Sequence, residues 1–498
     1  MQIQYRRSIL SLVCVPLIYM GIACQIMESK ELVYPLFADA APAKGPNAPT
    51  SAPAAFDDKT NGVENQGAFD DDKKNFANVE DAGDGLGPVY NANNCAVCHQ
   101  NPVTGTASQV TVIRAGHLDL KKHEFVEPAG GSLIFQRAVN ASIQAVVSPN
   151  NEVRSLRLAT NIAGDGYVEC IPDEAIRQVQ LAQPKSMQGA ILLVPVAVAA
   201  DGKGGFTFVE RIGRFGWKCQ DASLLNFSAG AYVNEMGITS PLQQKENSSN
   251  GRPVDDYDGK KPDPEDPALA DHPFGKDVES FTRFMRSLKA PPTEEKIADA
   301  MAVERGRALF MDNNKTGCAI CHVPSWTTVP VGTAIGDFKV PVELGNKTIR
   351  PYSDFMLHDI GTGDGIVQTQ HAQRPPHGCE VKENIRYSTI EVGEKVHRVL
   401  TDMYTYYEDD KGADGTADKK RDKQRVMRSS LVSTAYLIRT APLWGLRTRP
   451  QMMHDGLSLT IDEAIRRHEK QADRAERNYS RKLTPAERND LLAYLGTL

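Results

Sequence analysis

The chain has 498 residues and a formal net charge of −6 at pH 7. This length exceeds what one hydrophobic core usually supports, which predicts two domains with additional tails. The residues are 41% hydrophobic and 24% charged, the composition of an ordinary soluble globular protein, and the negative net charge gives no reason to expect a nucleic-acid partner.

Residues 1–24 have the pattern of a signal peptide. Arg6 and Arg7 form a positive segment, and an apolar stretch from Ser8 to Ala23 follows directly. This stretch is short for a membrane span and contains Pro16. The arginine pair superficially resembles a twin-arginine signal, but that route exports folded proteins, so we interpret the pair as part of an ordinary export signal.

Residues 25–79 are predicted to form a flexible tether. Within them, residues 38–55 are rich in Ala and Pro and have few large apolar groups, so they offer no core of their own. Cys24 is a candidate for a lipid anchor, although Gly21, at the position where Leu is expected, makes a poor lipobox. The first folded domain is therefore expected to begin near residue 80.

The pentapeptide C-x-x-C-H occurs twice, at residues 95–99 and 318–322. In the attachment site of a c-type haem, the two thiols form thioethers with the porphyrin vinyl groups, and the His supplies the proximal nitrogen to iron. A zinc site or two disulfides would leave the histidines without a role. We therefore predict two covalently bound haems and, since such haems are attached after export, a periplasmic location. The attachment residues are Cys95, Cys98, Cys318 and Cys321, and the proximal ligands are His99 and His322.

The first haem domain is placed at residues 80–290, and strand and loop signals dominate its first half. The apolar run Leu192–Val198 and the segment Phe206–Val209 flank a Gly-rich turn, the pattern of a β-hairpin. The segment Leu224–Met236 has a helical pattern. The domain is therefore expected to combine helices with a β-hairpin insertion.

The end of the first domain is indicated by a change of pattern. Residues 243–273 are polar and rich in Pro, which predicts a long loop. Apolar residues then recur at helical spacing from Val278 to Leu288, and Pro291-Pro292 stops that helix. We place the boundary there, with the second haem domain at residues 291–498.

The second haem domain begins with the helical segment Gly306–Phe310, shortly before its C-x-x-C-H motif, as small cytochromes c do. Residues 405–424 are charged and contain Gly. A calcium site is an alternative to a solvated loop there, although the spacing does not match an EF-hand. The aspartates concerned are Asp409, Asp410, Asp414 and Asp418.

Two helices are well marked at the C-terminal end. Thr460 and Glu463 form a capping box, and a helix that includes His468 on its apolar face is predicted to follow as far as Ala472. Thr484 begins the last helix, which is predicted to bury three leucines. These are Leu491, Leu492 and Leu495.

The group opposite each iron decides what the haem can do, because a six-coordinate iron transfers electrons and a vacant position can bind peroxide. His468 is the best distal candidate for the second haem, with His454 as its main competitor. For the first haem, His117 and Met236 are candidates, and a vacant position is a third alternative.

Trp217 is a candidate for a position between the haems, where it would relay electrons because an indole supports one-electron oxidation. The alternative is an ordinary packed aromatic. Spacing does not single out a general acid or base among Glu124, Glu127, Gln136 and Glu169. At most one disulfide can form among Cys170, Cys219 and Cys379, and small buried side chains are an equal alternative.

From about residue 80 to its end, the chain resembles the dihaem oxidoreductases, a family also described as dihaem peroxidases or thiol-oxidoreductase-like proteins. This family is related to bacterial dihaem cytochrome c peroxidases and to the dihaem enzyme that matures methylamine dehydrogenase. The matching stretches are Gly85–Ala92, Gly130–Ile134, Gly213–Lys218, Tyr352–Asp359, Thr440–Arg447, Met453–Gly456 and Ile461–Ile465.

The resemblance implies a mainly α fold with added β structure, in which two cytochrome-c-like domains each hold a haem and the first carries β-hairpin insertions. In the relatives, the residue fourteen positions after the His of a His-Asp/Asn-Gly turn is the distal ligand of the second haem. Here that turn contains His454, so the resemblance supports His468 and a bis-His iron of low potential. His117 resembles the distal His of the peroxidases.

The resemblance further implies reduction of hydrogen peroxide at the first haem, with catalytic roles for His117 and Trp217. The second haem would relay electrons from a small periplasmic donor such as a cytochrome c or cupredoxin. Two alternatives are a dihaem oxidase that modifies a protein and a dihaem electron carrier without peroxide chemistry. The thiol-oxidoreductase name draws no support here, because no C-x-x-C exists outside the haem motifs.

Overall fold

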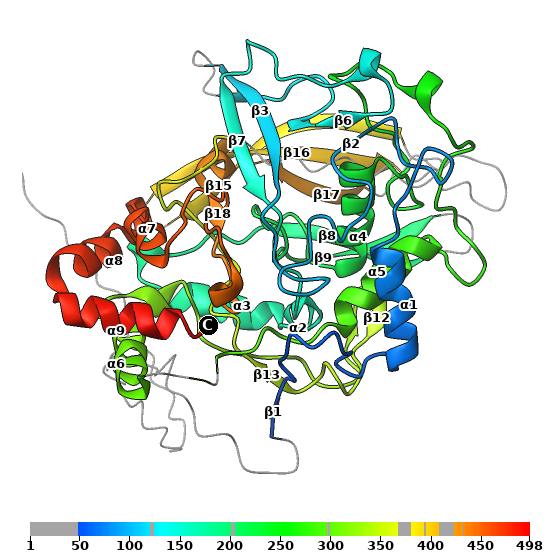
Figure 1. Ribbon diagram of the computed structural model, residues 1–498. Helices are drawn as coiled ribbons and strands as arrows, with labels where there is room; N and C mark the ends of the chain where they lie inside the picture. Colours follow the sequence, from blue (N-terminus) through cyan, green and yellow to red (C-terminus); the bar gives the residue numbers. More distant parts are fainter. Residues whose placement is uncertain are drawn as a thin grey trace, which may run out of the picture. The chain divides into compact units, whose positions relative to one another are not determined.

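The computed structural model describes residues 48–119, 124–200, 205–294, 296, 299–366, 380–392, 395–407, 423–430 and 432–498. All of them belong to one compact unit, Asp39–Leu498. The architecture is mixed, with short helices beside several small sheets (Figure 1), so it contains more β structure than the expected mainly α fold. Within the described residues, no helix is long and apolar enough to cross a membrane.

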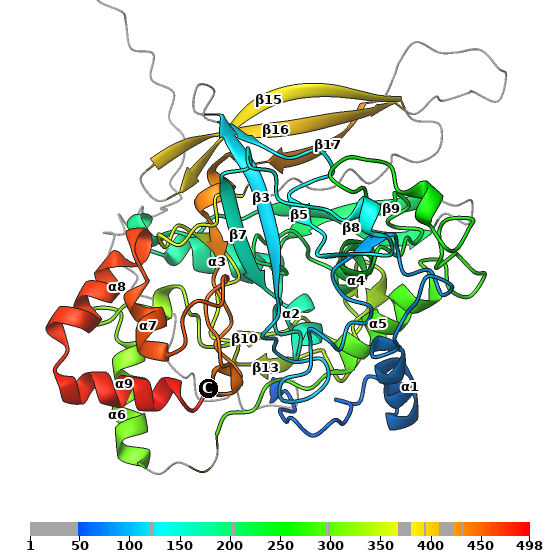
Figure 2. The same cartoon turned by 45° about the horizontal axis from the view of Figure 1, so that its top comes forward.

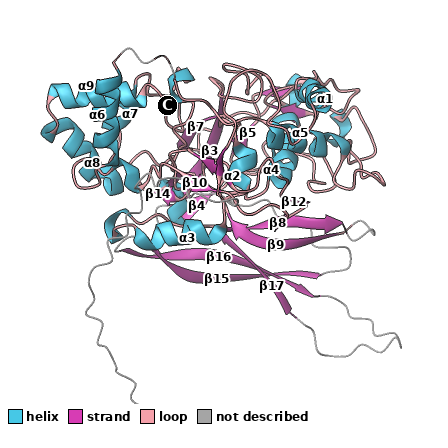
Figure 3. Cartoon of the chain, turned by 90° about the horizontal axis from the view of Figure 1, so that it is seen from below, coloured by secondary structure: helices cyan, strands magenta, loops and turns pink. Residues whose placement is uncertain are grey.

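Most of the helices form two groups, α1, α4 and α5 in one and α6 to α9 in the other, and β3 and β7 lie between the groups (Figures 2 and 3). In chain order the helices are α1 (Gln66–Phe76), α2 (Asp165–Glu169), α3 (Asp173–Ala182), α4 (Leu224–Ala231), α5 (Lys276–Ser287), α6 (Ala300–Met311), α7 (Ile461–Arg466), α8 (Asp473–Arg477) and α9 (Pro485–Leu495).

The larger sheets are antiparallel. In the first, β3 (Thr111–Asp119) pairs with β4 (Glu124–Val126), β5 (Leu133–Ile134) and β7 (Val153–Leu158). The hairpin is β8 (Leu193–Ala200) with β9 (Phe206–Ile212), and a further antiparallel sheet contains β15 (Glu380–Val392), β16 (Lys395–Tyr407) and β17 (Lys423–Ser430). The short strands are β1 (Thr50–Ser51), β10 (Trp326–Thr327) and β13 (Lys347–Ile349) in one sheet, and the pairs β2 (Val89–Tyr90) with β6 (Arg137–Ala138), β11 (Ala334–Ile335) with β12 (Phe338–Lys339), and β14 (Leu357–His358) with β18 (Ile438–Arg439).

Helix α1 lies in the segment that the sequence analysis assigns to a flexible tether. Its N-cap residue Asn65 accepts a hydrogen bond from the Ala68 amide at 3.0 Å. Phe69 and Phe76 are buried and pack on Phe284 of α5, with ring centroids 5.3 and 4.9 Å apart. The end of the predicted tether is therefore a packed helix, because its two phenylalanines find an apolar partner more than 200 residues away.

The helices and hairpin predicted for the first domain are confirmed. The β8–β9 hairpin matches the predicted strand–turn–strand pattern, and α4 with the π-turn Tyr232–Met236 spans the predicted helix. In α5, Val278, Phe281 and Met285 are buried, and the helix packs against both α1 and α4. The local sequence patterns therefore predicted these helices and this hairpin correctly.

The predicted capping box at Thr460 is present, and the last helix begins after Thr484 as predicted, where the structure shows a second capping box. Helix α7 is shorter than predicted, since it ends at Arg466 and His468 lies just beyond it. The reason is a change of hydrogen-bond partner: the amide of Glu469 donates to the Ile360 carbonyl at 2.9 Å instead of continuing the helix. His468 is thereby held between α7 and the segment around Ile360.

Contacts join the chain on either side of Pro291-Pro292. Arg286 of α5 binds Glu169 of α2 through Nε at 2.8 Å, and its guanidinium also binds Asp337 at 2.8 Å. Strand β1 pairs in parallel with β13, and Ala190 bridges Leu357. The two halves therefore fold against each other, and the boundary at Pro291-Pro292 stays a prediction.

Candidate functional site

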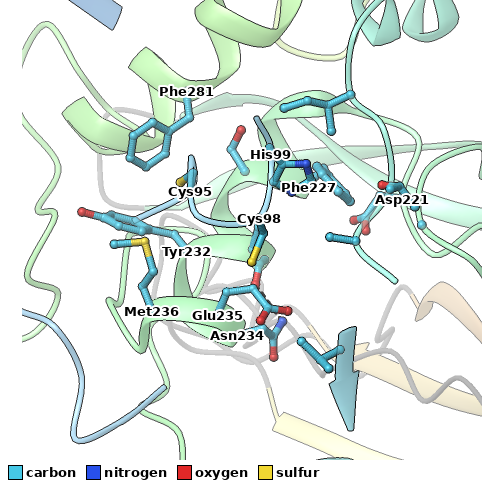
Figure 4. A pocket seen from close by; sticks show the side chains of 18 of the residues that line it. Cys95, Cys98, His99, Asp221, Phe227, Tyr232, Asn234, Glu235, Met236 and Phe281 are labelled. Atoms are coloured by element: carbon cyan, nitrogen blue, oxygen red, sulfur yellow. Dashed lines mark hydrogen bonds between the residues drawn. The ribbon is translucent and has the colours of Figure 1, made fainter. Parts of the chain in front are cut away.

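The first C-x-x-C-H motif opens into a cavity of 270 Å³ between β3, β7, α4 and α5. The side chain of Asn94 fixes the start of the motif by accepting a hydrogen bond from the Val97 amide at 2.8 Å. The amide of Cys98 donates to the Cys95 carbonyl at 3.2 Å, which closes a tight turn. Figure 4 shows the side chains of Cys95, Cys98 and His99 around the same space. The turn thus presents two thiols and one imidazole to a single cavity.

The His99 imidazole is suited to bind a metal in its neutral form. Burial lowers its pKa to about 4, with the main chain of Thr106 and Thr160 acting in the opposite direction. Its Nδ1 atom is buried and has no hydrogen-bond partner among the described residues. Burial also raises the pKa of the Cys98 thiol to about 11 and that of Cys95 further. The ring centroids of Phe76 and His99 are 6.3 Å apart, so Phe76 covers the cavity wall beside His99.

Ionisable side chains from distant segments line the same cavity, among them Asp221, Glu235 and Arg114. Burial raises the pKa of Asp221 to about 7 and also raises that of Glu235. Burial lowers the pKa of Arg114 to about 10, which leaves it cationic at neutral pH. The Nδ2 atom of Asn91 donates to Glu235 at 2.9 Å. Asp221 and Glu235 enter the space from different segments (Figure 4) and place two carboxyls of raised pKa beside the motif.

The second motif opens into a cavity of 190 Å³ within the apolar core of α6, α7 and α9. His322 and His468 both line it, with ring centroids 6.4 Å apart. Two metal–nitrogen bonds of about 2 Å, together with the two ring radii, separate such centroids by about 6 Å. The spacing therefore fits two imidazoles that bind one metal from opposite sides.

The orientation of both rings also fits two imidazoles that bind one metal. The Nδ1 atom of His322 is 3.0 Å from the Tyr352 carbonyl, and the Nδ1 atom of His468 is 2.8 Å from the Ala464 carbonyl. Each Nδ1 is thereby occupied as a donor, which leaves each Nε2 for a metal. Burial lowers the pKa of His322 to about 4 and also lowers that of His468, so both rings are neutral.

Trp217 lies between the two cavities and lines both of them. Its Nε1 atom donates to the Leu158 carbonyl at 2.7 Å, and its ring meets the His454 ring edge-on at a centroid distance of 6.2 Å. His454 places Nε2 2.5 Å from the Thr362 carbonyl. His454 therefore supports Trp217, and His468 is the histidine that faces His322.

The segment that carries Trp217 is fixed by buried charges. Lys218 and Arg157 bind the two carboxylate oxygens of Asp364 at 2.8 and 2.7 Å, and all three side chains are buried. These cations lower the pKa of Asp364 to about 2 despite its burial. The Trp217 backbone is therefore tied to β7 and to the segment at Asp364.

A family described as "Di-haem oxidoreductase, putative peroxidase" matches residues 106–373, more than half of the chain. The chain belongs to the di-haem oxidoreductase family. No protein among the curated ones matches it. Among solved structures, hydrazine synthase of Kuenenia stuttgartiensis is similar at 13% identity and a TM-score of 0.35, over 97% of this chain and 99% of that chain.

Membership in the di-haem oxidoreductase family implies two haems. The matched region contains the second C-x-x-C-H motif, whereas the first motif lies before it and His468 lies after it. The two cavities offer one site for each haem, and the buried neutral imidazoles and paired thiols of each fit such a group.

The structure does not bring His117 to the first cavity. It lies half-exposed on β3, and its Nδ1 atom pairs with Glu152 at 2.8 Å. Met236, the other predicted candidate, does line the cavity. Because side chains on a strand alternate between its two faces, Arg114, three positions earlier on β3, reaches the cavity instead.

Two of the acids named from the sequence, Glu169 and Glu127, have other partners. Glu169 binds Arg286, and Glu127 accepts a hydrogen bond from the Ser132 amide at 2.9 Å. The carboxyls that do line the cavity belong to Asp221 and Glu235, which no spacing signal connected with the haem motif. Asp221 follows Trp217 by four residues, and that proximity was the one available clue.

His358 is a further buried residue beside the second motif to which the sequence analysis gave no role. Its Nε2 atom is 2.8 Å from Asp354, and its Nδ1 atom is 3.8 Å from the Cys321 sulfur. Although burial opposes it, the neighbouring Cys321 and Asp354 raise the pKa of His358 well above its usual value.

The remaining cysteines do not form a disulfide within the described part of the chain. Cys170 and Cys219 are both free and buried. Cys379 and the aspartates proposed for calcium between residues 405 and 424 lie outside the described residues.

Proposed function

We propose that this protein is a periplasmic di-haem c-type peroxidase, which reduces hydrogen peroxide with electrons from a small redox protein such as a cytochrome c or cupredoxin. The observation that carries the proposal is the difference between the two cavities. The second contains a facing pair of histidines, whereas the described lining of the first contains His99 as its one histidine. Family membership supports the oxidoreductase class.

Each cavity would hold one haem through its own motif. Cys95 and Cys98 would attach the first porphyrin, and Cys318 and Cys321 would attach the second. His99 would bind the first iron, and His322 with His468 would bind the second from opposite sides. When bound, the haems supply one-electron chemistry and, at the first site, a position for peroxide.

The first cavity supplies the groups that move protons. Reduction of hydrogen peroxide consumes two electrons and two protons and releases two waters. One oxygen must lose a proton while the other gains one, and a carboxyl with a pKa near 7 can serve both transfers. We assign this role to Asp221. The cationic Arg114 stabilises negative charge that develops on peroxide, and Glu235 with Asn91 completes the polar wall.

Trp217 would carry electrons between the two sites. It borders both cavities, and its indole N–H is held by the Leu158 carbonyl. The second site, closed by two histidines, would accept electrons from the donor protein and pass them through this residue to the first. The roles of the two sites follow from their different surroundings.

The test is stopped-flow absorbance after hydrogen peroxide is added to the fully ferric protein and to protein with one haem reduced. We expect a rapid spectral change in at least one state, assigned to the first haem. The state that reacts shows whether reduction of one haem is required. Unchanged spectra in both states would reject the peroxidase proposal.

A di-haem electron carrier is the second candidate, and one observation favours it. The sulfur-containing side chains of Met236 and Met285 line the first cavity, and a thioether can serve as an axial haem ligand. Such a ligand would close the first site as His468 closes the second. A spectrum of two six-coordinate haems that is insensitive to peroxide would establish this alternative.

A further inference from the structure

A group of carboxylates gathers in the long loop between the π-turn Tyr232–Met236 and α5. The ligand oxygens of Asp258, Asp263 and Glu265 lie within 4.8 Å of one another. Glu246 belongs to the same loop. None of these residues lines either haem cavity.

One member of the cluster is buried without a full set of partners. Glu265 is only 5% exposed, and its Oε1 atom is buried and accepts no hydrogen bond, whereas Oε2 binds the amide and hydroxyl of Thr239. The Oε2 atom of Glu246 is likewise buried without a partner. Burial of an ionised oxygen is costly unless a cation or donor compensates it.

Among the described residues, the ammonium groups of the nearby lysines donate their hydrogen bonds to main-chain oxygens and not to these carboxylates. The Nζ atom of Lys260 donates to the Asp84 carbonyl at 3.0 Å, and that of Lys261 donates to the Asp255 carbonyl at 2.8 Å. Both ammonium groups are thus directed to main-chain oxygens. Within the described part of the chain, the three carboxylates converge without a hydrogen bond from a lysine or arginine side chain.

We propose that Asp258, Asp263 and Glu265 bind a calcium ion. The donor set is all oxygen, which selects a hard cation over zinc, copper or iron. Calcium binds six to eight oxygens at about 2.3–2.6 Å, so two of its ligands lie at most about 5 Å apart, as the cluster requires. Magnesium usually keeps several waters, and it suits a buried Glu265 oxygen less well.

The site would brace one wall of the first cavity. Glu265 holds Thr239, which follows the cavity residue Met236 by three positions. Gly85, at a positive φ of 111°, packs on Glu265 so closely that a Cβ atom would lie 2.8 Å from the Glu265 Cβ. Calcium would therefore link the segment before the first motif to the segment that carries Glu235 and Met236.

The experiment is calorimetric titration of the chelator-treated holoprotein with Ca²⁺ as the added metal. We expect the wild type to bind one Ca²⁺ ion per chain. The affinity for Ca²⁺ should fall at least tenfold in both Asp263→Asn and Glu265→Gln. Asp263 is exposed, so its variant tests binding without disturbing the core. Asp256→Asn, an exposed loop acid outside the cluster, is the matched control and should bind as the wild type does.

Thermal unfolding gives a second readout, since a ligand that binds the folded state raises the midpoint temperature of unfolding. Calcium should raise it in the wild type and in Asp256→Asn, with a smaller rise in the two cluster variants. Absence of binding in the wild type, unchanged binding in both cluster variants, or equal affinity for Mg²⁺ would each overturn the proposal. None of these outcomes depends on peroxide activity.

Discussion

At the residue scale, His468 has its orientation set by the chain around it. Its Nδ1 faces the Ala464 carbonyl, and its ring centroid lies 6.4 Å from that of His322. His468→Met would exchange the second imidazole for a thioether, which favours the reduced iron. We expect the potential of the second haem to rise on the order of 0.1 V, within the ~0.8 V range that axial ligands span. Spectroelectrochemical titration measures it.

The matched control for this change is His454→Gln. His454 lines the same cavity but is bound to the Thr362 carbonyl, so its loss should leave the potential nearly unchanged. If His454→Gln shifts the potential and His468→Met does not, the assignment of the distal ligand is wrong.

Asp221 should govern the pH dependence of the reaction with peroxide. Because its pKa is raised to about 7, it is mostly protonated below that pH and ionised above it. The ionised carboxylate is the form that accepts the proton from peroxide, so the rate should rise with pH up to about 7 and then level off. Asp221→Asn should lower the rate about 10²–10⁴-fold and abolish this rise.

Glu235→Gln provides the comparison for Asp221, because both carboxyls line the same cavity and both have raised pKa values. Stopped-flow rates between pH 5 and pH 9 distinguish them. A rise with pH that survives in Asp221→Asn and disappears in Glu235→Gln would transfer the proton-carrying role to Glu235.

At this scale, the sequence predicted site residues where the spacing between two residues reflects local structure. His468 follows His454 by fourteen residues, and both line the second cavity. Asp221 and Glu235 were missed because they approach the first motif only through long-range folding. No pattern near Cys95 points to either of them.

At the scale of elements, α1 is predicted to be part of the folded protein. Phe69 is 1% exposed and packs on Phe284, so Phe69→Ala would leave a cavity between α1 and α5. We expect the free energy of unfolding to fall by about 3–5 kcal/mol. Urea-induced unfolding, followed by circular dichroism, measures the loss.

The exposed Lys74 on the same helix is the control, and Lys74→Ala should change the free energy of unfolding by less than about 0.5 kcal/mol. Equal effects of the two substitutions would instead support the prediction that residues 66–76 belong to a flexible tether. Since Phe76 covers His99, the absorbance of the first haem gives an independent signal of the same disturbance.

Elements were predictable where their determinants are local. The capping box at Thr460, the start of the last helix at Thr484 and the β8–β9 hairpin contain their own signals and are confirmed. Helix α1 has mostly polar residues, and its buried Asp72 is bound by Arg283 of α5, a partner that sequence order hides. The early end of α7 has the same cause, because the bond from Glu469 to Ile360 competes with the helix.

At the scale of the whole molecule, the two haem motifs are separated by more than 200 residues, yet their cavities share Trp217. The sequence predicted this placement only as one of two equal alternatives, because it depends on how β7, the segment at Asp364 and the C-terminal helices meet. Buried Lys218 and Arg157 on Asp364 fix that meeting point. Communication between the haems therefore depends on contacts that no local pattern encodes.

Trp217→Phe should preserve the packing between the cavities and remove the easily oxidised indole. Electron transfer from the second haem to the first should slow at least tenfold, while the absorbance of each haem is retained. Flash reduction of the second haem followed at two wavelengths measures this rate. Trp326→Phe is the matched control. Trp326 is buried and, like Trp217, donates a hydrogen bond from Nε1 to a carbonyl, that of Ser353, at 2.8 Å. It lines neither cavity. Unchanged transfer in Trp217→Phe would mean that electrons pass directly between the haem edges, and slowing in both variants would trace the effect to lost stability.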